Sequence, residues 1–275
     1  MSDLHGNKTR YNKLFKTIER EKPEGVFLGG DLLPSTFGIN NDVDDFIQDV
    51  FLTNVSKLKR LGVKSRFFTI LGNDDPRIYE RILIEAEKDD LIEYVHNKTV
   101  SFNSLFVIGY SYVPPTPFMF KDWERYDVSQ YVDVGAVSPE KGFRTVKISK
   151  DKIRYSTIQE DLDNLSKKIA FEKTIFLFHS PPYKSYLDRA DLDGRKVDYA
   201  PIDVNVGSIA IQNFIKKNQP FLTLHGHVHE SARITGYWKE KFGKTYSFSA
   251  AHDGPELALV RFNTDDLKNA TRDLI

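Results

Sequence analysis

The chain of 275 residues contains no cysteine. This absence excludes disulfide scaffolds, thiolate zinc sites, iron–sulfur clusters and cysteine nucleophiles. Any metal ion would therefore be held by nitrogen and oxygen atoms. The sequence also lacks a run approaching the ~18 apolar residues that span a bilayer, and it opens with no basic stretch followed by an apolar one. We therefore expect a cytoplasmic protein with no membrane partner.

A surplus of charge of either sign is missing as well. Lys and Arg together number 39, and Asp and Glu together number 39, so the formal charge cancels. Proteins that bind extended nucleic acid usually carry a broad basic surplus, and a neutral chain weighs against such a partner. Hydrophobic residues make up 40% of the chain and aromatic residues 13%, which is enough apolar material for a sizeable core. We expect the chain to fold without a partner, and its oligomeric state stays open.

The first hundred residues alternate between helical and strand-like patterns. Apolar residues recur at helical spacing over Lys8–Glu21 and again from Val43 to Leu61. The apolar runs Val26–Leu28 and Arg66–Leu71 are too short for helices and lead into glycine-containing loops, so they predict buried strands. This alternation indicates parallel crossovers, which place the loops that follow the strands at one edge of the sheet. Ligands of α/β proteins bind at that edge.

The rest of the chain predicts further elements of the same domain. No tract rich in Gly, Ser or Pro separates two halves and no repeat is present, so residues 1–275 are predicted to form one domain built on two sheets. Residues 110–135 are rich in proline and aromatic side chains but irregular, and we expect them to be an insertion on the substrate side. The expected elements are strands at Leu105–Gly109, Thr174–Phe178 and Phe221–Leu224, helices at Ile158–Ile169 and Ser208–Lys217, and a closing meander of strands at Ala232–Tyr237, Lys244–Phe248 and Leu257–Phe262.

Residues of the types that bind metal ions gather at the ends of the predicted strands. Each motif alone is weak evidence, because Asp-x-His arises by chance and Gly-Asp after a strand is most often only a turn. Five such motifs in one order, each at a strand end, are hard to explain by coincidence. They are Asp3-Leu4-His5, Gly30-Asp31, Gly72-Asn73-Asp74-Asp75, His179 and Gly226-His227-Val228-His229.

This ordered set resembles the signature of the calcineurin-like metallophosphoesterase superfamily, and the resemblance extends over nearly the whole chain. Neighbouring residues strengthen it, in Leu28-Gly29-Gly30-Asp31, Phe178-His179-Ser180-Pro181-Pro182 and His225-Gly226-His227. The chain is similar to the small prokaryotic single-domain members. The resemblance implies an α/β fold, a four-layer α/β/β/α sandwich of two mixed sheets flanked by helices, with a site for two metal ions at the strand ends.

The resemblance also implies which residues hold these ions. Two dications ~3.5–4 Å apart repel strongly, and a shared carboxylate and a shared hydroxide lower that cost. The bridging hydroxide would attack phosphorus in line. Imidazole, carboxylate and amide ligands suit Mn, Fe, Co, Ni or Zn better than Mg or Ca. The implied ligands are Asp3, His5 and His229 for the first ion, Asn73, His179 and His227 for the second, and Asp31 as the bridge.

Two features depart from the family pattern. Most hydrolytic members have histidine after the asparagine, where it stabilises the transition state or protonates the leaving oxygen, and this chain has Asp74 there. We expect Asp74 to be the catalytic side chain at this position and to be ionised, which makes it a poor proton donor. Only Met1 and Ser2 precede Asp3, where the family has a complete strand, so we expect the reading frame to extend upstream.

A hydrolase of phosphomonoesters or phosphodiesters is the leading hypothesis, acting on a small phosphorylated substrate with nucleotides among the candidates. One alternative is a non-catalytic scaffold of the same fold, although a scaffold has no physical reason to keep a full ligand set. Another is a nuclease, which would normally add a basic surface. A lipid-precursor pyrophosphatase is a third, and it would need an apolar lid such as Phe118–Phe120.

Two further groups of residues allow more than one interpretation. In the segment 110–135, Lys121 and Arg125 interleave with Trp123 and Tyr126. This mixture either stacks a base and contacts a phosphate or forms a satellite hydrophobic cluster. His225 at a strand end could line the cleft, but solvent exposure is the commoner position for such a residue, and we expect it here.

Overall fold

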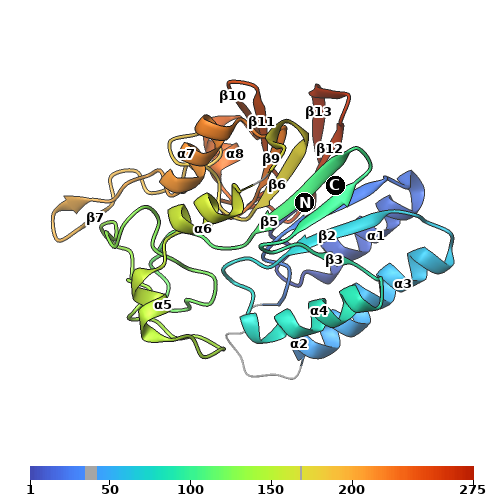
Figure 1. Cartoon of the computed structure of the whole chain (residues 1–275), viewed down its shortest axis with the longest axis horizontal. Helices are drawn as coiled ribbons and strands as arrows, with labels where there is room; N and C mark the ends of the chain where they lie inside the picture. The colour runs from blue at the N-terminus through green and yellow to red at the C-terminus, as the bar shows by residue number, and fades with distance from the viewer. Residues whose placement is uncertain (35–41, 168) are drawn as a thin grey trace.

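The computed structural model describes residues 1–34, 42–167 and 169–275 (Figure 1). Among them, no helix is long and apolar enough to cross a membrane. The helices are α1 Lys8–Glu21, α2 Asp42–Asp45, a π-helical segment Phe46–Leu52, α3 Thr53–Arg60, α4 Glu80–Lys88, α5 Lys150–Tyr155, α6 Ile158–Leu165, α7 Ile209–Asn218 and α8 Ser231–Thr235. The strands are β1 Gly25–Gly29, β2 Arg66–Ile70, β3 Glu93–Tyr94, β4 Thr99–Phe102, β5 Leu105–Tyr110, β6 Thr174–Phe178, β7 Lys196–Val197, β8 Ala200–Pro201, β9 Leu222–His225, β10 Lys239–Phe242, β11 Thr245–Ser249, β12 Ala258–Asn263 and β13 Asp266–Leu274.

Two sheets form the centre of the fold. The first contains the parallel strands β1, β2 and β3. The second has the order β10-β11-β9-β6-β5-β4, with a parallel centre and an antiparallel strand at each edge. Figure 1 shows α1, α3 and α4 on the outer side of the first sheet, and α6 and α7 on the outer side of the second. The expected α/β/β/α sandwich is confirmed, and β12 and β13 add a separate antiparallel pair.

Alternate side chains of the central strands enter two different cores. In β6, Phe176 and Phe178 belong to the core beneath the helices, whereas Ile175 and Leu177 lie in the core between the two sheets. Phe27 of β1 joins the same inner core. Each central strand is therefore buried on both faces, which allows helices to cover one side while the other sheet covers the opposite side. Strands of this kind are continuous apolar runs, so the sequence pattern predicts β1 and β6 correctly.

Other elements differ from the sequence-based expectation. Residues 232–237 do not form a strand, because α8 covers Ser231–Thr235 and ends at Gly236, whose φ of 76° lies in the left-handed region that glycine adopts readily. A helix of 5 residues is too short for periodicity to separate it from a strand. The expected helix Ile158–Ile169 is shorter, since α6 ends at Leu165, while Lys168 lies outside the described residues. β13 is a largely polar strand with no apolar run to reveal it.

The irregular segment after β5 packs into the protein. Trp123 is fully buried within the core beneath the helices. Lys121 is also fully buried and pairs with Glu124, and Arg125 pairs with Asp161. Both cations are thus neutralised by protein carboxylates. This arrangement favours the hydrophobic cluster over a surface that stacks a base and contacts a phosphate.

We expect Trp123→Ala to lower the free energy of unfolding by about 3–5 kcal/mol, because it would leave a large cavity in the core. Urea denaturation measures this loss. Tyr131→Ala is a control from the same segment, because Tyr131 is 68% exposed. It should change the free energy of unfolding by less than about 0.5 kcal/mol. Equal losses in the two variants would contradict the burial of Trp123.

Candidate metal centre

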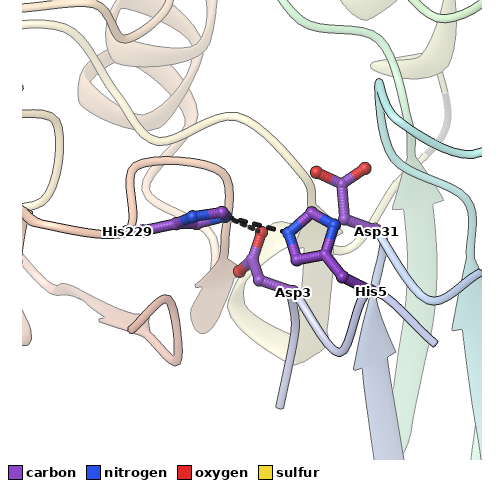
Figure 2. Close-up of side chains that lie close together, drawn as sticks. All are labelled: Asp3, His5, Asp31 and His229. Carbon is purple, nitrogen blue, oxygen red and sulfur yellow. Dashed lines mark hydrogen bonds and ion pairs between the residues drawn. The ribbon is translucent and has the colours of Figure 1, made fainter. Parts of the chain in front are cut away.

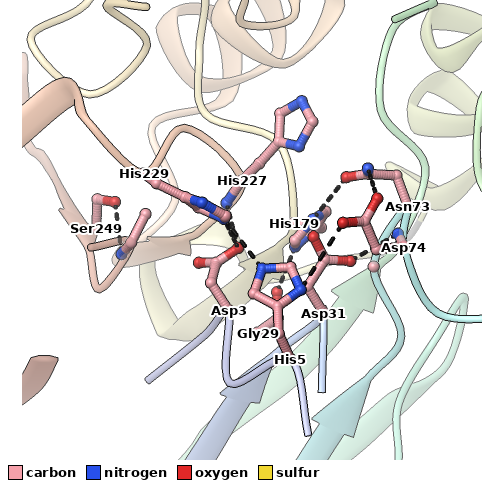
Figure 3. Close-up of polar contacts among 12 residues, drawn as sticks. Asp3, His5, Gly29, Asp31, Asn73, Asp74, His179, His227, His229 and Ser249 are labelled. Atoms are coloured by element: carbon pink, nitrogen blue, oxygen red, sulfur yellow. Dashed lines mark hydrogen bonds and ion pairs between the residues drawn. The ribbon is translucent and has the colours of Figure 1, made fainter. Parts of the chain in front are cut away.

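Four strands carry candidate ligands to one edge of the fold. Asp31 follows β1, Asn73 follows β2, His179 follows β6 and His227 follows β9. β1 is parallel to β2 and β6 is parallel to β9, so both strands of each pair end on the same side. Figure 3 shows the side chains gathered in one cluster beyond these strand ends. The fold thereby brings together residues that lie far apart in the sequence.

The first residues of the chain lie alongside the end of β1. The Asp3 N–H donates to the Gly30 carbonyl at 2.9 Å, and the His5 N–H donates to the Asp31 carbonyl at 2.8 Å. These backbone bonds hold Asp3 and His5 beside Asp31. The Asp-x-His motif therefore joins the cluster although it belongs to no strand.

A first group of possible metal ligands contains Asp3, His5, Asp31 and His229 (Figure 2). One ligand atom from each of these residues lies within 4.8 Å of those from the others. The two histidines face one another, with 3.2 Å between their Nε2 atoms, and His229 Nε2 lies 3.3 Å from Asp3 Oδ1. The four side chains thus converge on a common point.

A second group contains Asp31, His179 and His227, whose ligand atoms also lie within 4.8 Å of one another. Asn73 adjoins this group, because its Oδ1 atom lies 3.0 Å from His179 Nε2. The His227 N–H donates to Asp3 Oδ1 at 3.0 Å and so connects the two groups. Asp31 belongs to both groups, as expected of a bridging ligand, and the assignment of individual ligands stays a prediction.

The buried carboxylates of the cluster are stabilised by positive charge. Burial lowers the pKa of His179, but the Asp31 carboxylate, the charge of Asp3 and the Gly29 carbonyl together raise it to about 10. Burial likewise lowers the pKa of His229, and its hydrogen bond and charge interaction with Asp3 raise it to about 9. Burial raises the pKa of Asp3 and Asp31, yet the neighbouring histidines hold the pKa of both below the usual aspartate range. Buried carboxylates at these positions need cations beside them.

The donor atoms fit divalent metal ions. Asp3 Oδ2 is buried and has no hydrogen-bond partner among the described residues. His179 Nδ1 lies 2.7 Å from the Gly29 carbonyl and donates its proton there, so Nε2 is the ring nitrogen that is available to a metal ion. Because the pKa of His179 is raised, Nε2 carries a proton without a metal ion and donates it towards Asp31 Oδ2 at 3.2 Å and Asn73 Oδ1 at 3.0 Å. A cation at this point would satisfy all three atoms, and first-row transition metals favour such mixed nitrogen and oxygen ligands.

The backbone is strained where these residues sit. Asp3, His5, Asp31 and His227 have φ values of 57°, 45°, 53° and 75°, in the left-handed region. This conformation costs a residue other than glycine about 1–2 kcal/mol. At Gly72, an added Cβ atom would lie 2.3 Å from Asp31 Oδ1, so only glycine allows the loop after β2 to approach the cluster. Left-handed residues other than glycine also occur elsewhere in the chain, but here four candidate ligands of one polar cluster share this strain, which points to a functional site.

Asp75 holds in place the loops that carry two candidate ligands, a role that the sequence pattern does not reveal. Its carboxylate is fully buried and accepts hydrogen bonds from the N–H groups of Leu32, Leu33 and Gly72 at 2.8–3.1 Å. Leu32 and Leu33 follow β1, whereas Gly72 follows β2. Asp75 therefore ties together the two loops that carry Asp31 and Asn73.

Asp74 lies at the rim of the cluster with its side chain 46% exposed. Its Oδ1 atom accepts a hydrogen bond from Asn73 Nδ2 at 2.8 Å, and its Oδ2 atom lies 3.7 Å from His5 Nδ1. The Asp74 N–H donates to Asp31 Oδ1 at 2.8 Å. Burial, followed by the charge of Asp31, raises the pKa of Asp74 to about 6. Asp74 thus orients two candidate ligands and still presents its carboxylate to the outside.

His225 does not face solvent, and that expectation is wrong. The side chain is buried, with Nδ1 2.9 Å from the Ser180 carbonyl and Nε2 2.8 Å from Thr223 Oγ1. Both ring nitrogens are therefore used inside the protein. Strand β9 continues as far as His225, and its position between two other parallel strands forces this side chain inwards.

A cavity of about 430 Å³ opens from the cluster, and Asp31, Asn73, Asp74, His227 and His229 contribute to its wall. The rest of the wall comes mainly from two irregular parts of the chain, within residues 114–136 and 183–209. The first part overlaps the segment expected on the substrate side, although Trp123 does not line the cavity. The sequence analysis did not assign the second part to the cavity.

Comparison with known proteins finds a family that matches the chain and solved structures that share its fold. Residues 1–231 match the calcineurin-like phosphoesterase family, whereas no curated protein matches the chain. The fold is similar to TT1561 of Thermus thermophilus, with a TM-score of 0.57 and 14% identity over 100% of this chain and 96% of that chain. It is also similar to a dimetal phosphatase from Danio rerio, with a TM-score of 0.54 and 11% identity over 92% of this chain and 86% of that chain. At these identities the similarity shows the fold.

We expect Asp75→Asn to lower the free energy of unfolding by about 2 kcal/mol, measured by urea denaturation. An amide has one acceptor oxygen and would turn its NH₂ group towards backbone donors, leaving buried N–H groups without a partner. Asp74→Asn is the matched control, because the neighbouring side chain is half exposed and accepts no backbone hydrogen bond in its own loop. Equal stability of both variants and the unchanged protein would show that Asp75 does not tie the loops together.

Proposed function

The chain belongs to the calcineurin-like phosphoesterase family, and we propose that it hydrolyses phosphoesters with the help of two divalent metal ions. The observation that carries this proposal is the position of Asp31 in both groups of possible metal ligands. A single buried carboxylate between two sets of histidines is suited to two adjacent ions. The likeness in fold to a dimetal phosphatase supports the same proposal.

The residues available for the two ions follow from the two groups. When bound, two such ions would neutralise the phosphoryl oxygens and make a water molecule a nucleophile at neutral pH. Mn, Fe, Co, Ni and Zn suit these ligand types. Asp3, His5 and His229 would hold one ion, Asn73, His179 and His227 the other, and Asp31 both.

The protein's own groups prepare these ligands. The Gly29 carbonyl fixes the ring of His179, and the Asp74 N–H fixes the carboxylate of Asp31. Fixed ligands lose little orientational freedom when they bind an ion. The cavity beside them would bind the organic part of the ester, with Asp74 facing the bond that breaks. A non-catalytic scaffold would gain nothing from buried charge and strained backbone at this point.

We expect protein purified without a chelator to contain two transition-metal ions per chain. Asp31→Ala should remove both, because the bridging carboxylate serves each ion. His227→Ala should weaken one site, and His252→Ala should change neither, since His252 bonds to Glu256 outside the cluster. Elemental analysis of each purified variant measures the metal content, and hydrolysis of 4-nitrophenyl phosphate and bis(4-nitrophenyl) phosphate measures activity. Hydrolysis that persists undiminished after complete metal removal would refute the proposal.

The pKa of Asp74 leads to a second prediction, on how the rate depends on the leaving group. At pH 7 a carboxyl group with a pKa of about 6 is mostly ionised, and cations in the adjacent cluster would lower that pKa further. The leaving group would then depart without a proton, and the rate should fall steeply as the pKa of the leaving group rises. Asp74→His should supply a proton donor and flatten this dependence, by up to about 10²-fold for the poorest leaving group.

The measurement uses a series of aryl phosphates of graded leaving-group pKa. Asp74→Asn is the control, because it keeps the shape of the side chain and adds no acid. Parallel plots for Asp74→His and the unchanged protein would place Asp74 away from the leaving group.

A further inference from the structure

The cavity beside the metal centre is bounded by two parts of the chain that touch one another. Asp127 accepts hydrogen bonds from Ser208 Oγ at 2.5 Å and from the Ile209 N–H at 2.6 Å, which ties the first part to the start of α7. Gly135 approaches Val197 of the β7–β8 hairpin: a Cβ atom there would lie 3.5 Å from Val197. Figure 1 shows this hairpin and the region around α5 on the same side of the molecule. The cavity is therefore walled on both sides before any ligand binds.

Buried hydrogen bonds anchor residues 114–118, which line the cavity. Glu124 accepts hydrogen bonds from the N–H and the hydroxyl group of Thr116, and the buried ammonium group of Lys121 donates to the Thr116 carbonyl at 2.9 Å. Phe118 follows two residues later and lines the cavity. The buried ion pair thus positions the loop that carries Phe118.

The described wall of the cavity contains no lysine and no arginine. Its charged residues away from the metal centre are all acidic. Tyr183 donates a hydrogen bond to Asp203 at 2.6 Å, and burial together with the charge of Asp203 raises the pKa of Asp133. A rise of this kind shows that further negative charge is unfavourable there. These acidic residues are Asp127, Asp133, Asp203 and Glu230.

Apolar and aromatic side chains make up most of the remaining wall. Several large ones are unusually exposed, including Phe118 at 58% and Tyr131 at 68%. Exposed aromatic side chains around a concave site typically cover an apolar ligand. The exposed large hydrophobic residues of the wall are Phe118, Val128, Tyr131, Val134 and Ile209.

We propose that the cavity binds the organic group of a phosphoester whose alcohol is apolar or aromatic and carries no second phosphate. This inference rests on the proposed function and names its substrate class. A second phosphate on the alcohol, as in 1,4-phenylene bisphosphate, would place about two negative charges beside carboxylates in a described wall without lysine or arginine. An aromatic alcohol would instead cover the exposed rings and release water from them.

The first experiment compares substrates with the metal-loaded protein. We expect kcat/KM for 2-naphthyl phosphate to exceed that for phenyl phosphate by about tenfold, because the larger ring buries more apolar surface. Hydrolysis of 1,4-phenylene bisphosphate, which is phenyl phosphate with a second phosphate, should be slower than that of either ester. Phe118→Ser should reduce the ratio of naphthyl to phenyl activity, whereas Met119→Ser, at an exposed neighbour outside the cavity wall, should preserve it.

The second experiment changes the charge of the wall. Asp133→Lys should raise kcat/KM for 1,4-phenylene bisphosphate by about tenfold relative to phenyl phosphate, because it adds a cation for the second phosphate. Asp265→Lys makes the same change of charge in the exposed turn between β12 and β13 and should leave the ratio as it is. An equal effect of both variants would show that net charge, and not the cavity, determines the preference.

Calorimetric binding of 2-naphthylmethylphosphonate, which cannot be hydrolysed, separates the two proposals. If phenyl phosphate is not hydrolysed but the phosphonate binds and Phe118→Ser weakens it, the proposed function fails and the cavity assignment stands. If phenyl phosphate is hydrolysed but the naphthyl ester has no advantage, or Phe118→Ser behaves like Met119→Ser, the cavity assignment is overturned and the proposed function stands. Absence of both hydrolysis and binding overturns both.

Discussion

The contact between His179 and Asp31, 3.2 Å apart and almost wholly buried, is the interaction on which the site depends. His179 comes from the second sheet and Asp31 from the first, so this pair joins the carboxyl ends of the two sheets. Neither side chain could lie there alone, because an isolated buried charge costs several kcal/mol. The opposite charges, or a cation bound between them, make burial of both possible. Every other candidate ligand is placed around this pair.

The rest of the fold offsets the free energy that the buried charges and the strained loops of the site cost. Four candidate ligands have left-handed backbone conformations, and Asp75 is buried to hold two loops in place. The apolar core between the sheets keeps the strand ends in register, since Phe27, Ile175 and Leu177 pack there irrespective of what the loops do. A rigid two-sheet frame thus allows short loops to carry strain that they could not maintain alone.

Different parts of the chain form the candidate metal centre and the wall of the cavity beside it. The candidate ligands follow strands of the two sheets or lie alongside them, whereas the cavity wall comes mainly from long irregular stretches between elements. Loops of this kind can change in sequence without disturbing the sheets. Phe118 and Asp133 accordingly lie in the cavity wall, outside the metal centre, and the described wall contains no lysine or arginine.

The sequence by itself determined the α/β class, β1, β6 and the cluster of residues at the strand ends. These follow from local signals, because a strand buried on both faces is a continuous apolar run and the polar residue after it must lie at the edge of the sheet. Tertiary structure alone decided that Trp123 is core, that His225 is buried, that α8 is helical and that Asp75 ties two loops together. It also decided that side chains within residues 183–209 line the cavity. Each of these depends on which distant segment lies opposite, and neither periodicity nor composition within one segment carries that information.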